Sequence, residues 1–215
     1  MFLSNLPKSS IMDRSIPKNK FYTSCTAKQK DAFVEKINKI IWRNKLSIDT
    51  INVKGKDVEE ILIIEIQLKE KVKINDILLL INKTIPYHII FYVFCLDEYY
   101  ISTSIKHSNT FNVNNSVVDY TICSEWEKDT NKYKINLFND LDSIYLDFCN
   151  QLLPISNPIK SFDKLTETGE QLNKLKRDIQ NLESKIKSCR QFNKKVELNS
   201  QLKVLKQELK SIIDK

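Results

Sequence analysis

The sequence predicts an α+β fold, in which a mixed α/β domain with a single sheet precedes an antiparallel coiled-coil helical hairpin. Three observations lead to this prediction. Residues 58–68 and 87–96 are rich in β-branched and apolar side chains, as strands are. Apolar residues with helical spacing lie before, between and after these two segments, which is typical of helices packed on one sheet. From residue 162 onward the apolar spacing alternates between three and four residues, which indicates a coiled coil.

Length and composition favour a folded domain with an appendage. The chain has 215 residues, of which 41% are hydrophobic and 9% aromatic, and this is sufficient for a buried core. No apolar run approaches the roughly 18 residues of a membrane span. The first residues also lack the apolar segment of a signal peptide, so we expect a cytoplasmic protein without membrane association.

Rare residue types exclude several classes of enzyme. The only two glycines, Gly55 and Gly169, cannot form the glycine-rich loops that bind ATP or dinucleotides. The chain has only two histidines, His88 and His107, so a catalytic triad or a histidine-rich metal site would have to use one of them. Five cysteines without a CxxC pair predict reduced thiols rather than a zinc site. We therefore expect no cofactor and no metal.

Changes in composition divide the chain into three segments. Residues 1–24 are polar, contain two prolines and predict an extended N-terminal arm. Residues 25–158 hold the β-rich segments and predict the mixed α/β domain, which ends at a pair of prolines. Residues 162–215 hold the coiled-coil pattern and predict the helical hairpin.

The elements of the mixed domain follow from local patterns. Thr26 and Gln29 form a capping-box pattern, and apolar residues from Phe33 to Leu46 recur on one face, which predicts a helix to about Lys45. Asn75 is the expected cap of the second helix, and the near-continuous apolar run at 87–96 is typical of a central strand. Further strands are expected at residues 50–53, 58–68, 99–106, 117–126 and 132–138, and further helices at residues 76–83 and 141–153.

The C-terminal segment contains two apolar seams separated by a break. Four residues of the first seam repeat every seven positions, and three others fill the alternate position. The phase breaks across residues 190–193, and a second seam begins at Leu198. A break between halves of similar length favours an antiparallel hairpin, and a continuous rod with a stutter is the alternative. The first seam consists of Leu165, Leu172, Ile179 and Ile186 with Leu175, Leu182 and Cys189.

Positive charge is concentrated in the C-terminal segment. Residues 163–215 hold 13 basic and 8 acidic residues, and therefore +5 of the net charge of +7. Clustered lysines on a helix can bind a phosphate backbone, but an ordinary solvated helix face and a protein-docking surface are the alternatives. Because no row of aromatic residues interleaves the basic ones, docking is favoured over direct nucleic-acid contact. The candidate contact residues are Lys174, Lys176, Arg177, Lys185, Lys187, Arg190, Lys194 and Lys195.

A metal-dependent nuclease core is the only catalytic arrangement that the sequence approaches. Such a core needs an Asp and a D/E-x-K pattern on neighbouring strands. The nearest residues are Glu65, Asp97 and Lys106, but no Lys follows Glu65 at the required spacing and Ser104 replaces the carboxylate before Lys106. These three residues are therefore the weaker alternative, and no catalytic residue is expected. His88, at the start of the predicted central strand, is interpreted as a structural histidine.

Seven segments spread along the chain carry a resemblance to a known family: IPKNKFY (16–22), IIWRNKLS (40–47), EIQLK (65–69), TIPYHIIFYV (84–93), SEW (124–126), DLDSIYLDF (140–148) and QFNKKVELNSQLK (191–203). Together they resemble an uncharacterised bacterial family, domain-of-unknown-function family 4391 (DUF4391), over nearly the whole chain in order. The resemblance implies genes for DNA helicases and DNA methyltransferases nearby, in loci of anti-phage or restriction-type defence, and it supplies no catalytic residues.

These features together predict a non-catalytic accessory or scaffold subunit of a bacterial defence complex. We expect it to dock a helicase, a DNA methyltransferase or both, with DNA as a further candidate partner. Two alternatives stay open. One is a nuclease-like subunit with a degenerate metal-binding core, and the other is a homodimeric nucleic-acid-binding protein joined through the hairpin.

Overall fold

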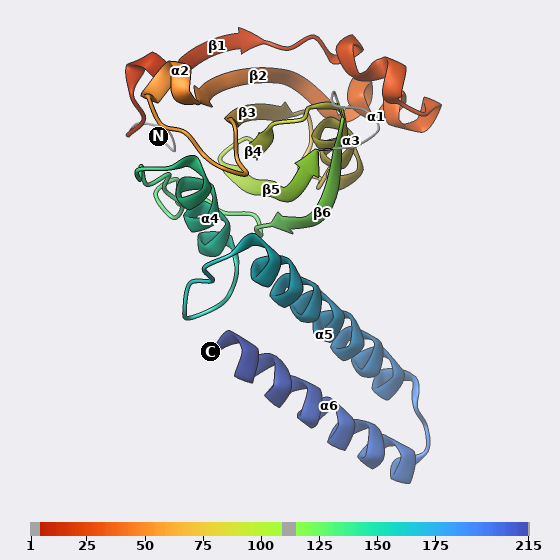
Figure 1. Ribbon diagram of the computed structural model, residues 1–215. Helices are drawn as coiled ribbons and strands as arrows, with labels where there is room; N and C mark the ends of the chain where they lie inside the picture. The colour runs from red at the N-terminus through yellow and green to blue at the C-terminus, as the bar shows by residue number, and fades with distance from the viewer. Residues whose placement is uncertain (1–4, 109–114, 215) are drawn as a thin grey trace. The chain divides into compact units, whose positions relative to one another are not determined.

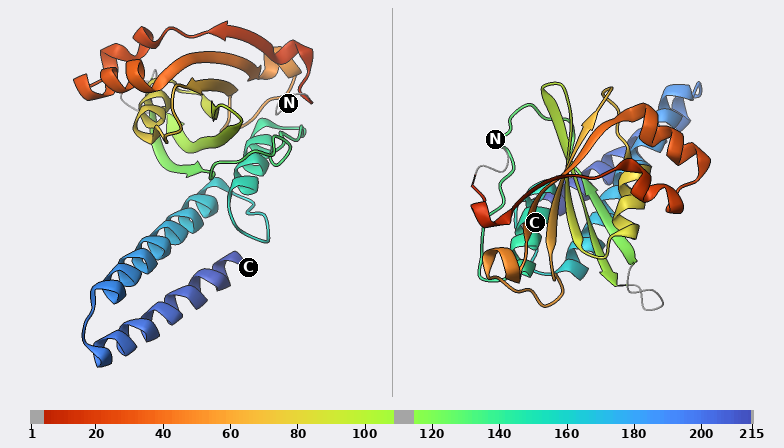
Figure 2. Two further views of the ribbon diagram at one scale, coloured as in Figure 1. Left: turned by 180° about the vertical axis from the view of Figure 1, so that it is seen from behind. Right: turned by 90° about the horizontal axis from the view of Figure 1, so that it is seen from above.

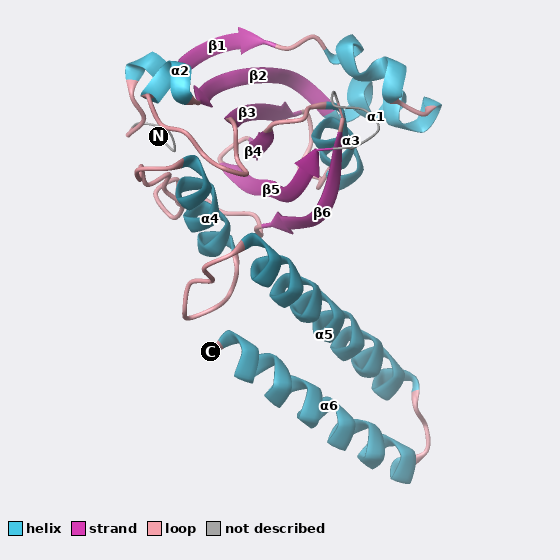
Figure 3. Cartoon of the chain, viewed as in Figure 1, coloured by secondary structure: helices cyan, strands magenta, loops and turns pink. Residues whose placement is uncertain are grey.

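The computed structural model describes residues 5–108 and 115–214 (Figure 1). The chain divides into two compact units, Met1–Leu152 and Leu153–Lys215. The first unit combines helices with a single six-stranded sheet, and the second holds two long helices (Figure 3). The prediction of a mixed α/β fold with one sheet and C-terminal helices is therefore confirmed.

The sheet contains its strands in the order in which they occur in the sequence. All neighbouring strands are antiparallel except the third and fourth, which are parallel and are connected through helix α3 (Asn75–Thr84). The fourth strand therefore has neighbours on both sides, as its apolar run predicts. The strands are β1 (Ile11–Ser15), β2 (Ile37–Leu46), β3 (Ile61–Leu68), β4 (His88–Cys95), β5 (Glu98–Ser108) and β6 (Ser116–Cys123).

Helices cover both faces of this sheet (Figure 2). Helix α1 (Ala27–Lys36) and α3 lie on the face where the side chains of Phe33 and Phe91 join the main hydrophobic cluster. Helix α4 (Leu141–Leu152) lies on the opposite face, where the hydroxyl groups of Tyr145 and Thr103 are 2.5 Å apart. Because a strand alternates its side chains between faces, each strand contributes to both layers of the core.

The N-terminal segment is more structured than the extended arm that its composition predicts. Residues 11–15 form β1, which pairs with β2 at the edge of the sheet. Short 3-10 helices, Lys8–Ser10 and Lys18–Ser24, precede and follow this strand. Because β1 is short and mostly exposed, its side chains show no apolar alternation from which a strand could be predicted. Its pairing depends on backbone hydrogen bonds with the distant strand β2.

The predicted helix over residues 26–45 is wrong in its second half. The capping box is present, since the backbone amide of Gln29 donates to Thr26 Oγ1 and the backbone amide of Thr26 donates to Gln29 Oε1. However, α1 ends at Lys36, and residues 37–46 form β2. Two register shifts interrupt the pairing of β2 with β3, and the first, between Ile37 and Lys39, lets Ile37 and Ile40 join the same buried cluster. Bulges of this kind convert strand alternation into a spacing that resembles a helix.

Loss of the capping box should lower stability measurably. For Thr26→Ala we expect the free energy of unfolding to fall by about 1 kcal/mol, because the Thr26 hydroxyl no longer accepts from the Gln29 backbone amide or donates to Gln29 Oε1. Urea denaturation measures this change. The matched control is Thr23→Ala, an exposed threonine outside the box, and equal losses in both variants would contradict a capping role.

Two of the predicted strands, at residues 50–53 and 132–138, are absent from the structure. Residues 48–51 form the short helix α2 (Ile48–Ile51), which ends at Asn52 in a left-handed conformation with φ of 56°. Residues 132–138 are irregular, although Tyr133 and Ile135 are buried. The Gln151 side chain accepts from the Lys134 amide and donates to its carbonyl, at 2.9 Å and 2.8 Å. A side-chain amide therefore provides the hydrogen bonds that a neighbouring strand would supply.

The remaining elements of the first unit agree with the prediction, with small differences at the ends. The strands expected at 58–68, 87–96, 99–106 and 117–126 correspond to β3, β4, β5 and β6, and the helix expected at 141–153 corresponds to α4. Helix α3 begins at Asn75, but the capping position is Ile74 and no side chain caps it. All five cysteines are free thiols, and Cys95 and Cys149 are buried.

The second unit consists of α5 (Phe162–Ser188) and α6 (Phe192–Ile213), which lie side by side in opposite directions (Figure 1). Lys206 of α6 pairs with Glu183 of α5 at 2.8 Å, and the amide of Ser156 donates to the carbonyl of Ile213. The chain reverses at residues 189–191, where the apolar phase breaks. Every predicted seam residue is buried or half-buried in the structure. Coiled-coil packing between the two helices stays a prediction.

Candidate functional sites

Glu65 is held by an arginine on the neighbouring strand. Arg43 of β2 donates from Nε to Glu65 Oε2 at 3.0 Å and from Nη2 to Oε1 at 2.8 Å. Its third contact is Asp13, at 2.9 Å from Nη1. The hydrogen bonds from Arg43 to Glu65 are the main cause that raises the pKa of Arg43 above its usual value. Both carboxylate oxygens of Glu65 therefore serve a bidentate ion pair.

Asp97 and Lys106 lie near opposite ends of β5. Asp97 is an exposed residue of the turn that precedes this strand, and it lies 3.4 Å from Lys128. Its own backbone amide and Lys128 lower its pKa. Lys106 lies nine positions after Asp97 along extended chain, which corresponds to roughly 30 Å. The structure therefore does not bring Glu65, Asp97 and Lys106 together.

Lys106 is a buried lysine at the C-terminal end of α3. Its side chain is only 5% exposed, and Nζ donates to the carbonyls of Asn82 at 3.0 Å and Ile85 at 2.7 Å. Carbonyls at a helix C-terminus favour a positive charge, whereas burial opposes it. Burial prevails and lowers the pKa of Lys106 to about 7.

His88 lines a cavity of about 290 Å³ together with Lys106, at the start of β4. The histidine is 7% exposed, and its ring meets the ring of Tyr145 edge-on with centroids 4.6 Å apart. Burial, and secondarily the charge of Lys106, lower the pKa of His88 to about 4. The ring is therefore neutral near pH 7 and acts as part of the packed layer under α4. His107 is exposed and pairs with Asp119 at 2.9 Å.

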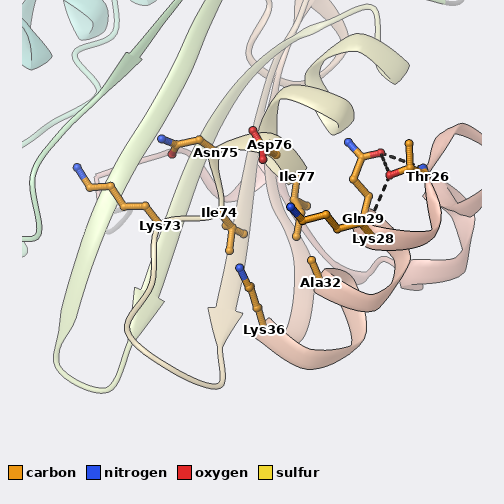
Figure 4. A pocket seen from close by; sticks show the side chains of 10 residues that line it. All are labelled: Thr26, Lys28, Gln29, Ala32, Lys36, Lys73, Ile74, Asn75, Asp76 and Ile77. Carbon is orange, nitrogen blue, oxygen red and sulfur yellow. Dashed lines mark hydrogen bonds between the residues drawn. The ribbon is translucent and has the colours of Figure 1, made fainter. Parts of the chain in front are cut away.

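A second cleft, of about 480 Å³, lies between α1 and the start of α3 (Figure 4). Lys28 and Lys36 extend into it from α1, and Asp76 lines it from the first turn of α3. Lys73 is committed elsewhere, since Nζ donates to the Ser124 carbonyl and to Glu125, both at 3.1 Å. Nothing in the spacing of these lysines predicts the cleft, because it depends on how α1 packs against α3.

All eight basic residues expected to contact nucleic acid or a partner are exposed, but they are not evenly spread. Five of them lie in residues 184–195, which contain no acidic residue and which we call the basic tip. A hollow of about 640 Å³ in this tip is lined by Lys185, Arg190 and Lys194. The other three candidates lie in the middle of α5, at positions 174–177, with acidic residues before and after them.

Helix α6 leaves apolar side chains in solvent. None of its 22 residues, all of which the structure describes, is buried. Phe192, Val196 and Val204 are 79%, 54% and 59% exposed, and they lie outside the seam that faces α5. The seam pattern does not predict that these three residues are exposed, since their exposure depends on which face of α6 packs against α5.

The sequence matches the family described as "Domain of unknown function (DUF4391)" over residues 5–209. This chain belongs to that family. The match spans all six strands and nearly all of both C-terminal helices. No curated protein and no solved structure matches the chain.

Two further observations concern the described part of this DUF4391 protein. None of its helices combines the length and the apolar composition that crossing a membrane requires. Across residues 5–108 and 115–214, no three His, Cys, Asp or Glu side chains gather in an arrangement suited to a metal ion.

Proposed function

We propose that this DUF4391 protein is a non-catalytic accessory subunit of a bacterial anti-phage or restriction-type defence complex. In this role α6 binds a protein partner, a helicase or a DNA methyltransferase. The observation that carries the proposal is the exposure of Phe192, Val196 and Val204 on a helix without any buried residue. The identity of the partner follows from the genes that the family resemblance implies.

The exposed residues of α6 provide a physical reason for docking. Burial of a Val or Phe side chain contributes about 1.5–3 kcal/mol relative to full exposure. This contribution is largely unrealised for Phe192, Val196 and Val204. Apolar side chains surrounded by polar ones are typical of protein interaction sites.

The polar residues of the α/β unit also support a non-catalytic role over the nuclease-like alternative. Glu65 is bound on both oxygens by Arg43, and Lys106 is bound by two carbonyls of α3. Asp97 lies at the other end of β5 from Lys106. Each side chain has a structural partner of its own, and the three do not converge on a common substrate position.

Affinity capture of the tagged full-length chain from extracts of its native host tests the proposal. We expect a helicase or a methyltransferase to be recovered in equal amounts with and without nuclease treatment. The variant Val196→Glu/Val204→Glu should lose the partner, because two charges replace the apolar contact. The matched control is Gln180→Glu/Asn181→Glu, which adds the same two charges at exposed polar positions of α5 and should retain the partner.

Two results would contradict this function. Recovery that disappears after nuclease treatment would mean that nucleic acid, not α6, connects the proteins. A homodimer in solution that Val196→Glu/Val204→Glu dissociates would make a second copy of this chain the occupant of the exposed residues. Light scattering on the purified chain and on both variants distinguishes the second result.

A further inference from the structure

All charged side chains of the basic tip are positive. Its 12 residues hold five basic side chains, all exposed, and no acidic residue. The neighbouring Glu183 is already paired with Lys206 of α6. Across residues 5–108 and 115–214, the ion pairs of the structure include none of the five basic residues of the tip. Lys187 also acts on the Glu183 carboxylate through its charge, but no acidic residue lies within the tip itself, so most of its positive charge stays available to an external partner.

Two of these lysines occupy positions that helix energetics disfavour. Lys194 and Lys195 lie in the first turn of α6, where the helix dipole favours acidic side chains and where this helix has none. Gln191, at the capping position, supplies no side-chain hydrogen bond. By contrast, Lys185 and Lys187 lie in the last turn of α5, where cations are favourable. The tip thus contains lysines at positions where they lower the stability of the helix, and such departures from local stability are typical of binding sites.

We propose that the basic tip binds the phosphate backbone of nucleic acid. Lys185, Arg190 and Lys194 line its hollow and present three cations from the end of one helix, the turn and the start of the next. Four of the five basic residues are lysines, which bind phosphates as point charges and lack the planar fork of arginine. Binding should therefore depend strongly on salt and little on sequence.

This contact goes beyond the docking of a protein partner and does not require it. The purified full-length chain should bind a labelled 25-base-pair duplex in fluorescence anisotropy at low salt. Backbone-only binding of this kind has a Kd of about 10⁻⁶–10⁻⁴ M at physiological salt, so the titration extends to high micromolar protein. Five phosphate contacts correspond to a slope of log K against log salt of about −4 to −5.

The decisive variant is Lys185→Gln/Arg190→Gln/Lys194→Gln. We expect at least about tenfold weaker binding and a slope that is shallower by about 2 to 3, because three phosphate contacts are lost. The matched control, Lys174→Gln/Lys176→Gln/Arg177→Gln, removes the same charge from the middle of α5 and should change affinity by less than about threefold. Circular dichroism should show equal helix content in both variants.

Three outcomes would overturn the proposal. The first is equal weakening by the two variants, which would indicate general charge attraction rather than a site at the tip. The second is the absence of duplex binding at low salt by the unmodified chain. The third is competition by polyglutamate as effective as competition by DNA at equal charge, which would indicate an acidic protein as the partner. Val196→Glu/Val204→Glu, studied for docking, leaves all basic side chains of the tip in place, so the two proposals can fail separately.

Discussion

Replacement of Gly55 by alanine is expected to lower the free energy of unfolding by about 3 kcal/mol, through the loss of charge-assisted hydrogen bonds. A Cβ atom at this position would lie 2.2 Å from the carbonyl oxygen of Val58 and 2.7 Å from Asp142 Oδ2. The first of these atoms belongs to the backbone, so the loop itself must move. Steric contact, not backbone conformation, makes glycine necessary here, since no glycine has a positive φ.

The same loop connects the sheet to α4. Asp142 Oδ1 accepts from the amides of Asp57 at 2.9 Å and Val58 at 3.0 Å. A carboxylate in the first turn of a helix also interacts favourably with the helix dipole. Displacement of Val58 weakens these hydrogen bonds to a charged acceptor, each of which contributes about 1.5–3 kcal/mol.

Chemical denaturation of Gly55→Ala and Lys56→Ala measures the effect. Lys56 is exposed and adjacent, and its replacement leaves alanine at a position where a Cβ is already present, so stability should change by less than about 0.5 kcal/mol. Without the close contacts, Gly55→Ala should stabilise the protein by about 0.4–1 kcal/mol, because alanine restricts the unfolded chain. The sign of the change therefore decides whether the loop packs on α4 as described.

Acidification is expected to destabilise the protein through His88. Burial and the charge of Lys106 lower its pKa from the usual 6.5 to about 4, although Asp142 and a hydrogen bond with the Lys106 backbone act in the opposite direction. Between these two values the unfolded chain binds a proton that the folded chain does not bind. Stability is therefore complete above pH 6.5 and falls as the pH decreases toward 4, by about 2 kcal/mol between pH 7 and pH 5.

Urea denaturation across this range tests the assignment to His88. The variant His88→Gln should be less stable at pH 7, since it loses the contact with the Tyr145 ring, but its stability should change by about 2 kcal/mol less between pH 7 and pH 5. The matched control is His107→Gln, which removes the exposed histidine beside Asp119 and should keep the dependence of the unmodified chain. Equal pH dependence in the unmodified chain and His88→Gln would show that His88 is not the group responsible.

Local sequence signals predict much of this fold because they act over a few residues. The capping box at Thr26 and Gln29 gives the start of α1 correctly. The apolar run at 87–96 gives both the existence and the central position of β4. By contrast, β2 is predicted as a helix, since its two bulges conceal the strand period.

The candidate sites are predicted unevenly for a similar reason. The exposure of the basic residues from Lys174 to Lys195 follows from their outward positions relative to the apolar seam. Their concentration at the tip follows from the reversal of the chain between α5 and α6. The environments of His88 and Lys106 cannot be predicted from neighbouring residues, because helices α3 and α4, distant in sequence, bury them.

The sequence by itself determined the fold class, the capped start of α1, the two C-terminal helices and the positive charge of the segment that contains them. These properties depend on composition and on contacts within a few residues. Only the tertiary structure decided that residues 37–46 form a strand, that Glu65 is bound by Arg43, and that burial shifts the pKa of His88 and Lys106. Those properties depend on backbone pairing and desolvation, which distant segments provide only after the chain has folded.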